Sequence, residues 1–445
     1  MGSNLEANMG DAVAVDLHFL GRELRLDLPR GWHLVGEYPP EPCPGLAEPG
    51  GGLRAALGAP IGARLPADLG GLRIVLAVDD ISRPTPVRDF FPALVQWLES
   101  RGARRSDICV LFALGVHRRM TQAEAAHRLG FEESFDLAWH NHDCRDDTAH
   151  VDLGTTSRGT PVHLNRRLAE ADLIVCVGSV EPHPLLGFGG GLKMIIPGLA
   201  HERTIAANHM QGVTPQRCNF VGCTESDMRL DLEEGALKLG RPIFIVNALL
   251  NERQQVHAFV CGDPVQAHRE AVRRVRETAS RRLPGPVDVA IVTSSPLNAD
   301  LRQGMKGIAH AEPAVREGGL IVAFLECRSG IGDLAIGKKS LPNGVLRAIL
   351  RLLGPSRVLW FVDKVKRGAG TEERFLSHFS LQVVRKNRIL VFSPNLPPDT
   401  GRRMGIFLQF DSPESMLKEA ARLAPARATV AVFPMSAATY ADCPF

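Results

Sequence analysis

The sequence predicts an α/β protein of two domains, each with a mainly parallel sheet flanked by helices. Its 445 residues exceed the size at which one hydrophobic core stops growing. Short apolar runs alternate with segments of helical spacing, and this alternation occurs twice along the chain. Hydrophobic residues make up 44% and charged residues 23%, which is ordinary for a globular protein.

The first alternation follows residues 37–70, whose Pro, Gly and Ala predict a long connection around at most one short helix. Apolar runs then predict buried strands. They are Leu72–Val78, Ile108–Leu114 and Leu173–Val177. Helices are expected between them, and a glycine just beyond each one is a stop signal. They are Val87–Ser100 and Thr121–Leu129.

The second alternation begins after Pro284-Gly285-Pro286. The predicted strands are Val287–Val292, Leu320–Leu325, Val358–Val362, Ile389–Phe392 and Ala428–Phe433. The predicted helices are Asn298–Ala309, Val345–Leu353 and Pro413–Leu423. A polar, arginine-rich helix over 265–284 is expected to join a first domain (1–272) to a second (285–445), whose last residues can pack back on the first. The active site is expected in the crevice between the domains.

Charge and composition exclude several classes of protein. The 52 basic and 49 acidic residues give a net charge of +3, so neither a nucleic acid nor a membrane surface is an expected partner. No run of about 18 apolar residues predicts a transmembrane helix, and the first residues do not resemble a signal peptide. Nine irregularly spaced cysteines indicate reduced thiols. We expect a cytoplasmic protein, and the sequence allows a homo-oligomer.

Polar clusters follow three strands of the first domain. They lie at Asp79–Pro86, at Gly115–Arg118 and at Glu181–Pro184. Ligands of an open α/β sheet bind outside the carboxyl ends of its strands, so we expect these clusters to converge. His117 and His183 each belong to a cluster, and either one alone is more often structural than catalytic. Two imidazoles in one pocket suit a reaction that needs a proton acceptor on each side of its substrate, such as racemisation.

A glycine-rich loop, GFGGGLK over 187–193, follows the third strand. Glycines allow the backbone to approach a ligand closely and to turn N–H groups toward phosphate. The loop is neither a P-loop nor a dinucleotide fingerprint, because Lys193 lacks a following Ser or Thr and Leu192 replaces the last required glycine. A flexible turn with an exposed lysine is the alternative. His201 and His209 are eight residues apart, which is not the spacing of a helical metal pair.

At these residues the sequence resembles the nickel-pincer-nucleotide lactate racemase family. The matching segments are DDISRPTP (79–86), GVHRRMT (115–121), GSVEPH (178–183), GFGGGLKMIIPG (187–198) and TIAANH (204–209). Weaker agreement continues over 261–268 and 303–306, so the resemblance spans both domains. The order and spacing of the first five motifs together are specific.

The resemblance implies an enzyme that inverts the 2-carbon of a 2-hydroxyacid by reversible hydride transfer, through a 2-keto acid. Its cofactor is a nickel-carrying pyridinium-3-thioamide-5-thiocarboxylate mononucleotide made by maturation enzymes. By position, Lys193 would carry this cofactor covalently and His209 would be the protein ligand of nickel, for which imidazole is suitable. His117 and His183 would be the catalytic histidines. Asp79, Arg83 and the glycines Gly189, Gly190 and Gly191 would contact the cofactor.

Substrate contacts are implied at Arg83, Gln303 and Lys306. An arginine fork matches a planar carboxylate. Where lactate-specific members have an aromatic residue beside the glutamine, this chain has Arg302. That arginine could contact a second carboxylate, a polyol chain or a phosphate, or it could be a solvent-exposed helix residue. The identity of the acid is therefore open.

Two other functions are compatible with the sequence. A dinucleotide-dependent 2-hydroxyacid dehydrogenase would use His117 or His183 as its acid–base group, although the dinucleotide fingerprint is incomplete. A nickel or nucleotide carrier would need neither histidine.

Overall fold

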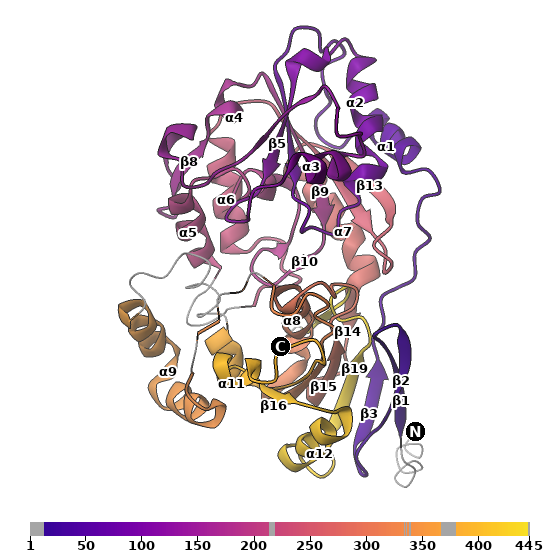
Figure 1. Ribbon diagram of the computed structural model, residues 1–445, viewed down its shortest axis with the longest axis vertical. Helices are drawn as coiled ribbons and strands as arrows, with labels where there is room; N and C mark the ends of the chain where they lie inside the picture. Colours follow the sequence, from indigo (N-terminus) through magenta and orange to yellow (C-terminus); the bar gives the residue numbers. More distant parts are fainter. Residues whose placement is uncertain are drawn as a thin grey trace. The chain divides into compact units, whose positions relative to one another are not determined.

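The computed structural model of the protein describes residues 13–212, 219–332, 334, 336–337, 340–365 and 380–443. Contacts divide the chain into two compact units. The central unit comprises Pro42–Thr214 and Gly222–Thr278, and the terminal unit comprises Met1–Glu41, Pro215–Val221 and Ala279–Phe445. Each unit contains one six-stranded sheet with helices packed on it, so the predicted fold class is confirmed (Figure 1).

The sheet of the central unit has its predicted strands in the middle. Its order is β13 (Val256–Gly262), β12 (Ile243–Leu250), β9 (Leu173–Val180), β4 (Ile74–Asp79), β5 (Ile108–Ala113) and β6 (Ala138–Asn141). All neighbours are parallel except β12 and β13, which are antiparallel. Every residue of β4 and β9 is buried, which explains their continuous apolar sequences.

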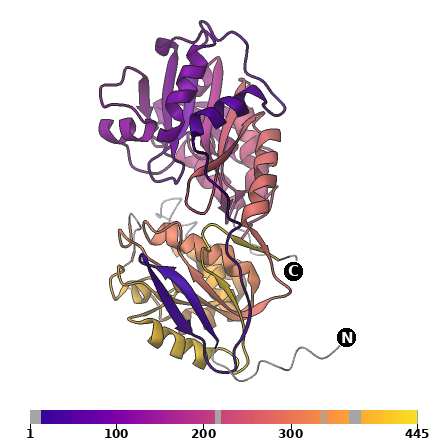
Figure 2. The same cartoon turned by 90° about the vertical axis from the view of Figure 1, so that its right-hand side faces the viewer.

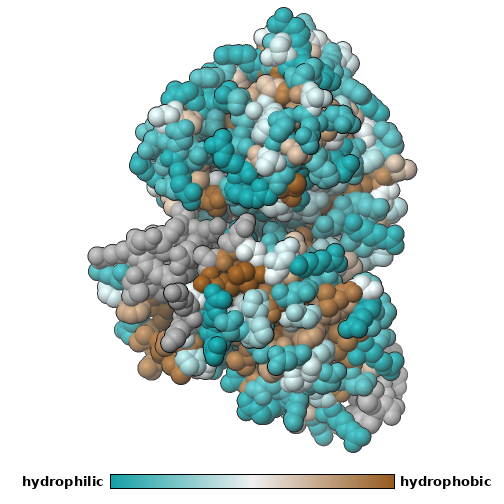
Figure 3. Space-filling view, in the orientation of Figure 1, coloured by the Kyte–Doolittle hydropathy of each residue, from teal (hydrophilic) through white to brown (hydrophobic). Residues whose placement is uncertain are grey.

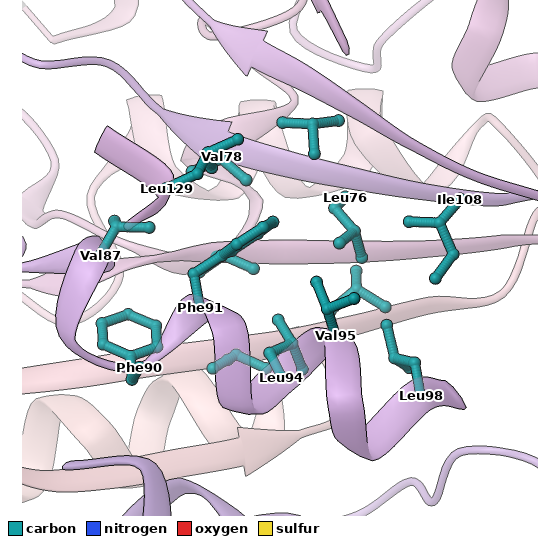
Figure 4. Packing of buried hydrophobic residues seen from close by; sticks show 14 of the residues in the cluster. Leu76, Val78, Val87, Phe90, Phe91, Leu94, Val95, Leu98, Ile108 and Leu129 are labelled. Atoms are coloured by element: carbon teal, nitrogen blue, oxygen red, sulfur yellow. The ribbon is translucent and has the colours of Figure 1, made fainter. Parts of the chain in front are cut away.

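Helices of the central unit cover this sheet. They are α1 (Pro49–Gly58), α2 (Phe91–Glu99), α3 (Gln122–Leu129), α4 (Arg166–Glu170), α5 (Glu202–Gln211), α6 (Asp227–Leu237) and α7 (Gln266–Ala279). Leu94, Val95 and Leu98 of α2 pack against Leu76 of β4 and Ile108 of β5 (Figure 4). The apolar positions of α2 recur every three or four residues, so one face of the helix meets the sheet.

Helix α3 shows how local sequence fixes an element. Its N-cap Thr121 accepts a hydrogen bond from the Glu124 backbone, while the Glu124 side chain accepts one from the Thr121 backbone. Gly130 ends the helix in a left-handed conformation (φ 72°). A capping box and a C-terminal glycine satisfy backbone groups that the helix itself cannot pair.

The sheet of the terminal unit is parallel throughout. Its order is β18 (Leu408–Phe410), β17 (Arg388–Phe392), β16 (Val315–Phe324), β15 (Val287–Thr293), β19 (Thr429–Phe433) and β3 (His33–Glu37). The accompanying helices are α8 (Leu301–Ala311), α9 (Asn343–Val365), α11 (Thr400–Met404) and α12 (Pro413–Leu423).

The N-terminal segment differs from the expected domain division. Strand β3 pairs with β19, and the hairpin of β1 (Ala14–Phe19) and β2 (Arg22–Asp27) packs on the same core (Figure 2). Backbone pairing and apolar packing therefore assign the start of the chain to the terminal unit, and not to a domain over 1–272. At the other end, β20 (Tyr440–Asp442) pairs with β14 (Ser280–Arg282) of the same unit.

The helix expected to link the domains is α7, which lies almost entirely in the central unit and ends at its boundary with the terminal unit. One further expectation is wrong. The strand expected over Val358–Val362 is helical and lies within α9. A short apolar run suits a strand or a helix equally well, so its periodicity could not decide.

The described surface is mainly hydrophilic in the view of Figure 3. Large apolar side chains that are exposed gather on α9, where Leu352, Trp360 and Phe361 are more than half exposed. Among the described helices, none combines the length and the apolar character needed to cross a membrane.

Candidate functional site

The candidate site lies at the carboxyl edge of the central sheet. The chain passes from β4 to β5 and β6 on one side, and then returns to β9 on the other side of β4. Strand order therefore reverses between β4 and β9, and open α/β sheets bind ligands at this switch point. The loops that follow these strands begin at Asp80 and Glu181, and the loop that follows β5 carries His117.

Asp79 has a structural role at the end of β4. The residue is 3% exposed, and its carboxylate pairs with the Arg128 guanidinium and accepts a hydrogen bond from Thr85 Oγ1 at 2.6 Å. Arg128 also donates to the carbonyls of Arg83 and Thr85. Burial raises the pKa of Asp79, and the charge of Arg128 opposes this shift. Its carboxylate is thus bonded inside the protein beside the 80–85 loop, and the expectation that Asp79 contacts a cofactor stays a prediction.

Asp80 is paired with His117. Its Oδ2 lies 2.9 Å from His117 Nδ1, and its Oδ1 accepts a hydrogen bond from the Ser82 backbone. Although burial alone would raise the pKa of Asp80, its hydrogen bond with His117 and the charge of Arg83 hold that pKa well below its ordinary value. Asp80 is thus a carboxylate, and the side chain of His117 remains 21% exposed. Such a pair orients an imidazole for proton transfer.

His183 lies on a short hairpin after β9. The strands β10 (Pro182–His183) and β11 (Gly187–Phe188) are antiparallel, with His183 opposite Gly187. His183 Nδ1 accepts hydrogen bonds from the backbone N–H groups of Leu185 at 3.2 Å and Leu186 at 3.3 Å. The turn between the two strands therefore fixes the orientation of the ring.

The loops are tied to one another by hydrogen bonds. Thr85 Oγ1 lies 2.8 Å from Ser179 Oγ of β9, which joins the loop after β4 to the neighbouring strand. The Gly115 backbone donates to the Gly198 carbonyl at 2.9 Å, joining the loop after β5 to the segment beyond the glycine loop. These bonds tie the loops after β4 and β5 to β9 and to the segment beyond the glycine loop, and the convergence of His117 and His183 in one pocket stays a prediction.

The glycine loop rests on two buried side chains. Arg229 of α6 donates to the carbonyls of Phe188 and Gly190, and His268 Nε2 lies 2.8 Å from the Gly189 carbonyl. Arg229 is fully buried, and burial lowers its pKa to about 10. A buried cation is stabilised by such charge-assisted hydrogen bonds, so the loop carbonyls and Arg229 hold each other in place.

Two of the loop N–H groups have partners inside the protein. Gly189 N donates to the Glu181 carbonyl at 2.8 Å, and Gly191 N donates to Asn247 Oδ1 at 3.1 Å. Both N–H groups are thus used within the protein, and the expectation that Gly189, Gly190 and Gly191 contact the cofactor stays a prediction. Gly190 has a different reason to be glycine, because a Cβ there would lie 2.6 Å from Val180 Cγ2 and its φ is 74°.

Lys193 and His209 lie close enough to interact. Lys193 follows the loop in a 3-10 turn (Gly191–Met194), and His209 is in the last turn of α5. His209 Nδ1 donates to the Ile205 carbonyl at 2.8 Å, which leaves Nε2 as the nitrogen with the lone pair. Burial, with a smaller contribution from the charge of Lys193, lowers the pKa of His209 to about 4. The imidazole is neutral at pH 7 and suited to bind a metal.

The residues present fit a tethered metal cofactor. A metal-binding histidine usually donates its other N–H to a carbonyl, as His209 does. Asn247 Nδ2 is buried beside the glycine loop and has no hydrogen-bond partner among the described residues. The described side chains contain no group of three or more His, Cys, Asp or Glu that could hold a metal ion.

The remaining candidates lie in the terminal unit. Arg302, Gln303 and Lys306 are on α8, which begins at the N-cap Asp300. Gln303 is 8% exposed, and its Oε1 has no hydrogen-bond partner within the described part of the chain. Arg83 is in the central unit, with its Nε 4.0 Å from Asp80 Oδ2. The predicted crevice between domains stays a prediction.

Four residues of the site were not predicted individually: Asp80, Arg229, Asn247 and His268. Asp80 was part of a recognised cluster, and its position directly after a strand was the available signal. Arg229 and Asn247 act on the loop backbone from distant positions that no local pattern marks, whereas His268 ends the weakly matching segment 261–268.

Comparisons with known proteins agree with this geometry. A family model described as the lactate racemase N-terminal domain matches residues 21–220. A lactate racemase of Thermoanaerobacterium thermosaccharolyticum is 30% identical over 285 residues, which cover 63% of this chain and 66% of the relative, just under two thirds of its length. A lactate racemase of Lactiplantibacillus plantarum is 28% identical over 365 residues, covering 81% of this chain and 83% of the relative.

Solved structures show the same fold. The lactate racemase apoprotein of T. thermosaccharolyticum superimposes with a TM-score of 0.81 at 23% identity, covering 97% of this chain and all of that one. A protein of Thermotoga maritima gives a TM-score of 0.61 at 20% identity, covering 84% of this chain and 94% of that one. The chain belongs to the lactate racemase family.

Proposed function

We propose that this protein is a nickel-dependent racemase or epimerase that inverts the 2-carbon of a 2-hydroxyacid. The observation that supports the proposal is that the Asp80–His117 pair, His183 and Lys193 all follow strands of one sheet at its carboxyl edge, with His209 close enough to Lys193 to interact with it. Relatives named lactate racemase support a racemase activity.

Lys193 and His209 would hold the cofactor. Lys193 would carry the nickel-pincer nucleotide covalently, and His209 Nε2 would be the protein ligand of nickel, since its Nδ1 is bonded to a carbonyl. When bound, this group would accept hydride from C2 and return it to either face, so that the substrate passes through a 2-keto acid. Imidazole is too weak a base to remove the C2 hydrogen directly, and a hydride acceptor removes that difficulty.

Residues of the chain would handle the proton and the charge of the substrate. His117 would take the proton of the 2-hydroxyl group, and the Asp80 carboxylate would stabilise the resulting imidazolium. Arg83, Gln303 and Lys306 would hold the substrate carboxylate. We further propose that Arg302 contacts a second polar or anionic group of the substrate. Racemisation rates for lactate, malate, hydroxyglutarate and sugar acids, measured by chiral chromatography, test this choice.

A first experiment tests the mechanism. A 2-hydroxyacid that carries deuterium at C2 is racemised in light water, and the product is analysed by mass spectrometry. Hydride transfer keeps the deuterium in the product. Rapid replacement by solvent hydrogen would show direct proton abstraction and would overturn the mechanism.

A second experiment tests the cofactor. The protein is co-expressed with enzymes that make the nickel-pincer nucleotide, and its peptides and metal content are measured. We expect added mass on the peptide with Lys193 and about one nickel per chain. An unmodified Lys193 would overturn the cofactor assignment, and tight, saturable NAD binding would support a dehydrogenase instead.

A further inference from the structure

The Nδ1 atoms of His117 and His183 have opposite kinds of hydrogen-bond partner. His117 Nδ1 faces the Asp80 carboxylate at 2.9 Å, which can only accept a hydrogen bond, and more distantly the Ser82 hydroxyl at 3.4 Å, which can also accept one. His183 Nδ1 faces two backbone N–H groups, of Leu185 and Leu186, which can only donate. In a neutral imidazole the partner of one nitrogen decides which nitrogen carries the proton.

We propose that the two histidines are therefore held as different tautomers and share the proton transfer unequally. His117 carries its proton on Nδ1 and offers the Nε2 lone pair as an immediate base. His183 carries its proton on Nε2, and it can exchange a proton with the substrate only after the turn at Leu185 and Leu186 has released Nδ1. This division of roles rests on the proposed function.

The proton balance shows why release is required. At His117 the hydroxyl O–H bond breaks, an Nε2–H bond forms, and the positive ring is paired with Asp80. At His183 the same step needs an Nε2 lone pair, hence a proton on Nδ1, and that proton would point at two N–H donors. The reverse step needs a His183 imidazolium, which meets the same conflict.

The turn that blocks His183 is held at both ends. Residue pairs Pro182–Phe188 and His183–Gly187 close the hairpin. Gly187 has a φ of 76°, and a Cβ there would lie 1.7 Å from the Cys223 carbonyl oxygen. The chain beyond the turn is thus packed against a second backbone segment, so the direction of the two N–H groups is fixed by the fold.

Steady-state rates of racemisation conceal such a difference. Two enantiomers have an equilibrium constant of one, so kcat/KM is the same in both directions whatever each histidine does. The test must observe each imidazole, or each half of the reaction, separately.

The first test is nitrogen NMR of the apoprotein labelled with 15N-histidine, with signals assigned from His117→Gln and His183→Gln. Long-range proton–nitrogen correlations at neutral pH are expected to show a protonated Nε2 in His183 and a protonated Nδ1 in His117. The same tautomer in both rings, or a protonated or averaged Nδ1 in His183, would overturn the proposal. This result does not depend on racemase activity, so it stands apart from the proposed function.

The second test follows 2-keto acid formation in a single turnover of the loaded enzyme. The His183→Gln variant retains His117, whose Nε2 lone pair is available at once. The His117→Gln variant retains only His183, whose Nδ1 is held by the turn. We expect His183→Gln to oxidise its preferred enantiomer about 10- to 100-fold faster than His117→Gln oxidises the opposite one, as expected for releasing two backbone hydrogen bonds. His127→Gln, at an exposed position of α3, is the matched control and should match the wild-type rate. Equal rates in the two site variants, or the reverse order, would overturn the proposal.

Discussion

The two six-stranded sheets follow one plan, yet their carboxyl edges carry different chemistry. In the central sheet strand order reverses between β4 and β9, and in the terminal sheet it reverses between β15 and β19. The central edge presents imidazoles and a lysine. At the terminal edge Ser294 Oγ donates to Asn298 Oδ1 at 2.6 Å, and Glu326 accepts from the Leu20 backbone at 3.3 Å.

Ser294 and Glu326 at the terminal edge thus bond to other groups of the terminal unit, whereas polar groups of the central edge combine into pairs suited to proton transfer and metal binding. The shared topology provides a suitable edge twice, and the residues placed on it decide the function. Four predictions test this contrast, from the largest expected effect to the smallest.

Lys193→Ala should remove all measurable racemisation, because the proposed attachment point of the cofactor is lost. The melting temperature of the apoprotein should change by no more than about 2 °C, since a half-buried lysine contributes little to stability. Chiral chromatography and thermal denaturation measure the two effects. Lys418→Ala, at an exposed position of α12, is the control, and an equal loss of activity in it would contradict the assignment.

Asp80→Asn and Glu326→Gln compare a carboxylate from each edge. Asp80→Asn should lower kcat/KM by about 10²- to 10⁴-fold, because the imidazolium of His117 loses its counter-charge. Glu326→Gln should instead lower the unfolding free energy by about 1–2 kcal/mol and leave kcat/KM of the folded protein unchanged. Urea denaturation and initial rates separate the two outcomes. A large decrease of kcat/KM in both variants would contradict the proposed difference between the two sheet edges.

Arg128→Met should lower the unfolding free energy by about 3–5 kcal/mol, because it leaves the Asp79 carboxylate buried without its partner. The double variant Asp79→Asn with Arg128→Met should recover part of this loss, since no unpaired charge remains. Urea midpoints of the three proteins provide the measurement. A double variant less stable than Arg128→Met would show that the pair does not act as a charge pair.

The stability of the apoprotein should fall as the pH drops from about 6.5 to 4, in part through His142. His142 is buried with Nε2 3.0 Å from the Ala200 carbonyl, and burial lowers its pKa to about 4. Between these pH values the unfolded chain binds a proton that the folded protein excludes, which costs up to about 3 kcal/mol by linkage. His142→Gln should flatten the dependence in urea titrations at pH 7 and 4.5. His127→Gln should leave the slope unchanged.

The sequence predicted the parts of the fold that depend on local pattern. Strands β4, β5 and β9 are buried on both faces, so each is an unbroken apolar run, and the polar residues after them mark the site. Strand β3 could not be found this way. It is partly exposed and is defined by pairing with β19, almost 400 residues later in the sequence.

The same limit applies to the site. His117, His183, Lys193 and His209 lie in recognisable motifs. Asp79 and Asp80 are neighbours of one type, and only the three-dimensional structure shows that Asp79 is paired with Arg128 and Asp80 with His117. Arg229 lies in an ordinary helix, and its three-dimensional contacts alone connect it to the glycine loop.

The pairing of β3 with β19 also has a consequence for synthesis on the ribosome. The residues of β3 leave the ribosome before those of the central unit, but their partner strand is made only after about 390 further residues. The central unit is complete in sequence by then, and domains generally fold as units during synthesis. We therefore expect β3 to remain unpaired with β19 while the central unit folds. A nascent chain that ends before β19 would hold a formed glycine loop together with an N-terminal strand that has no partner.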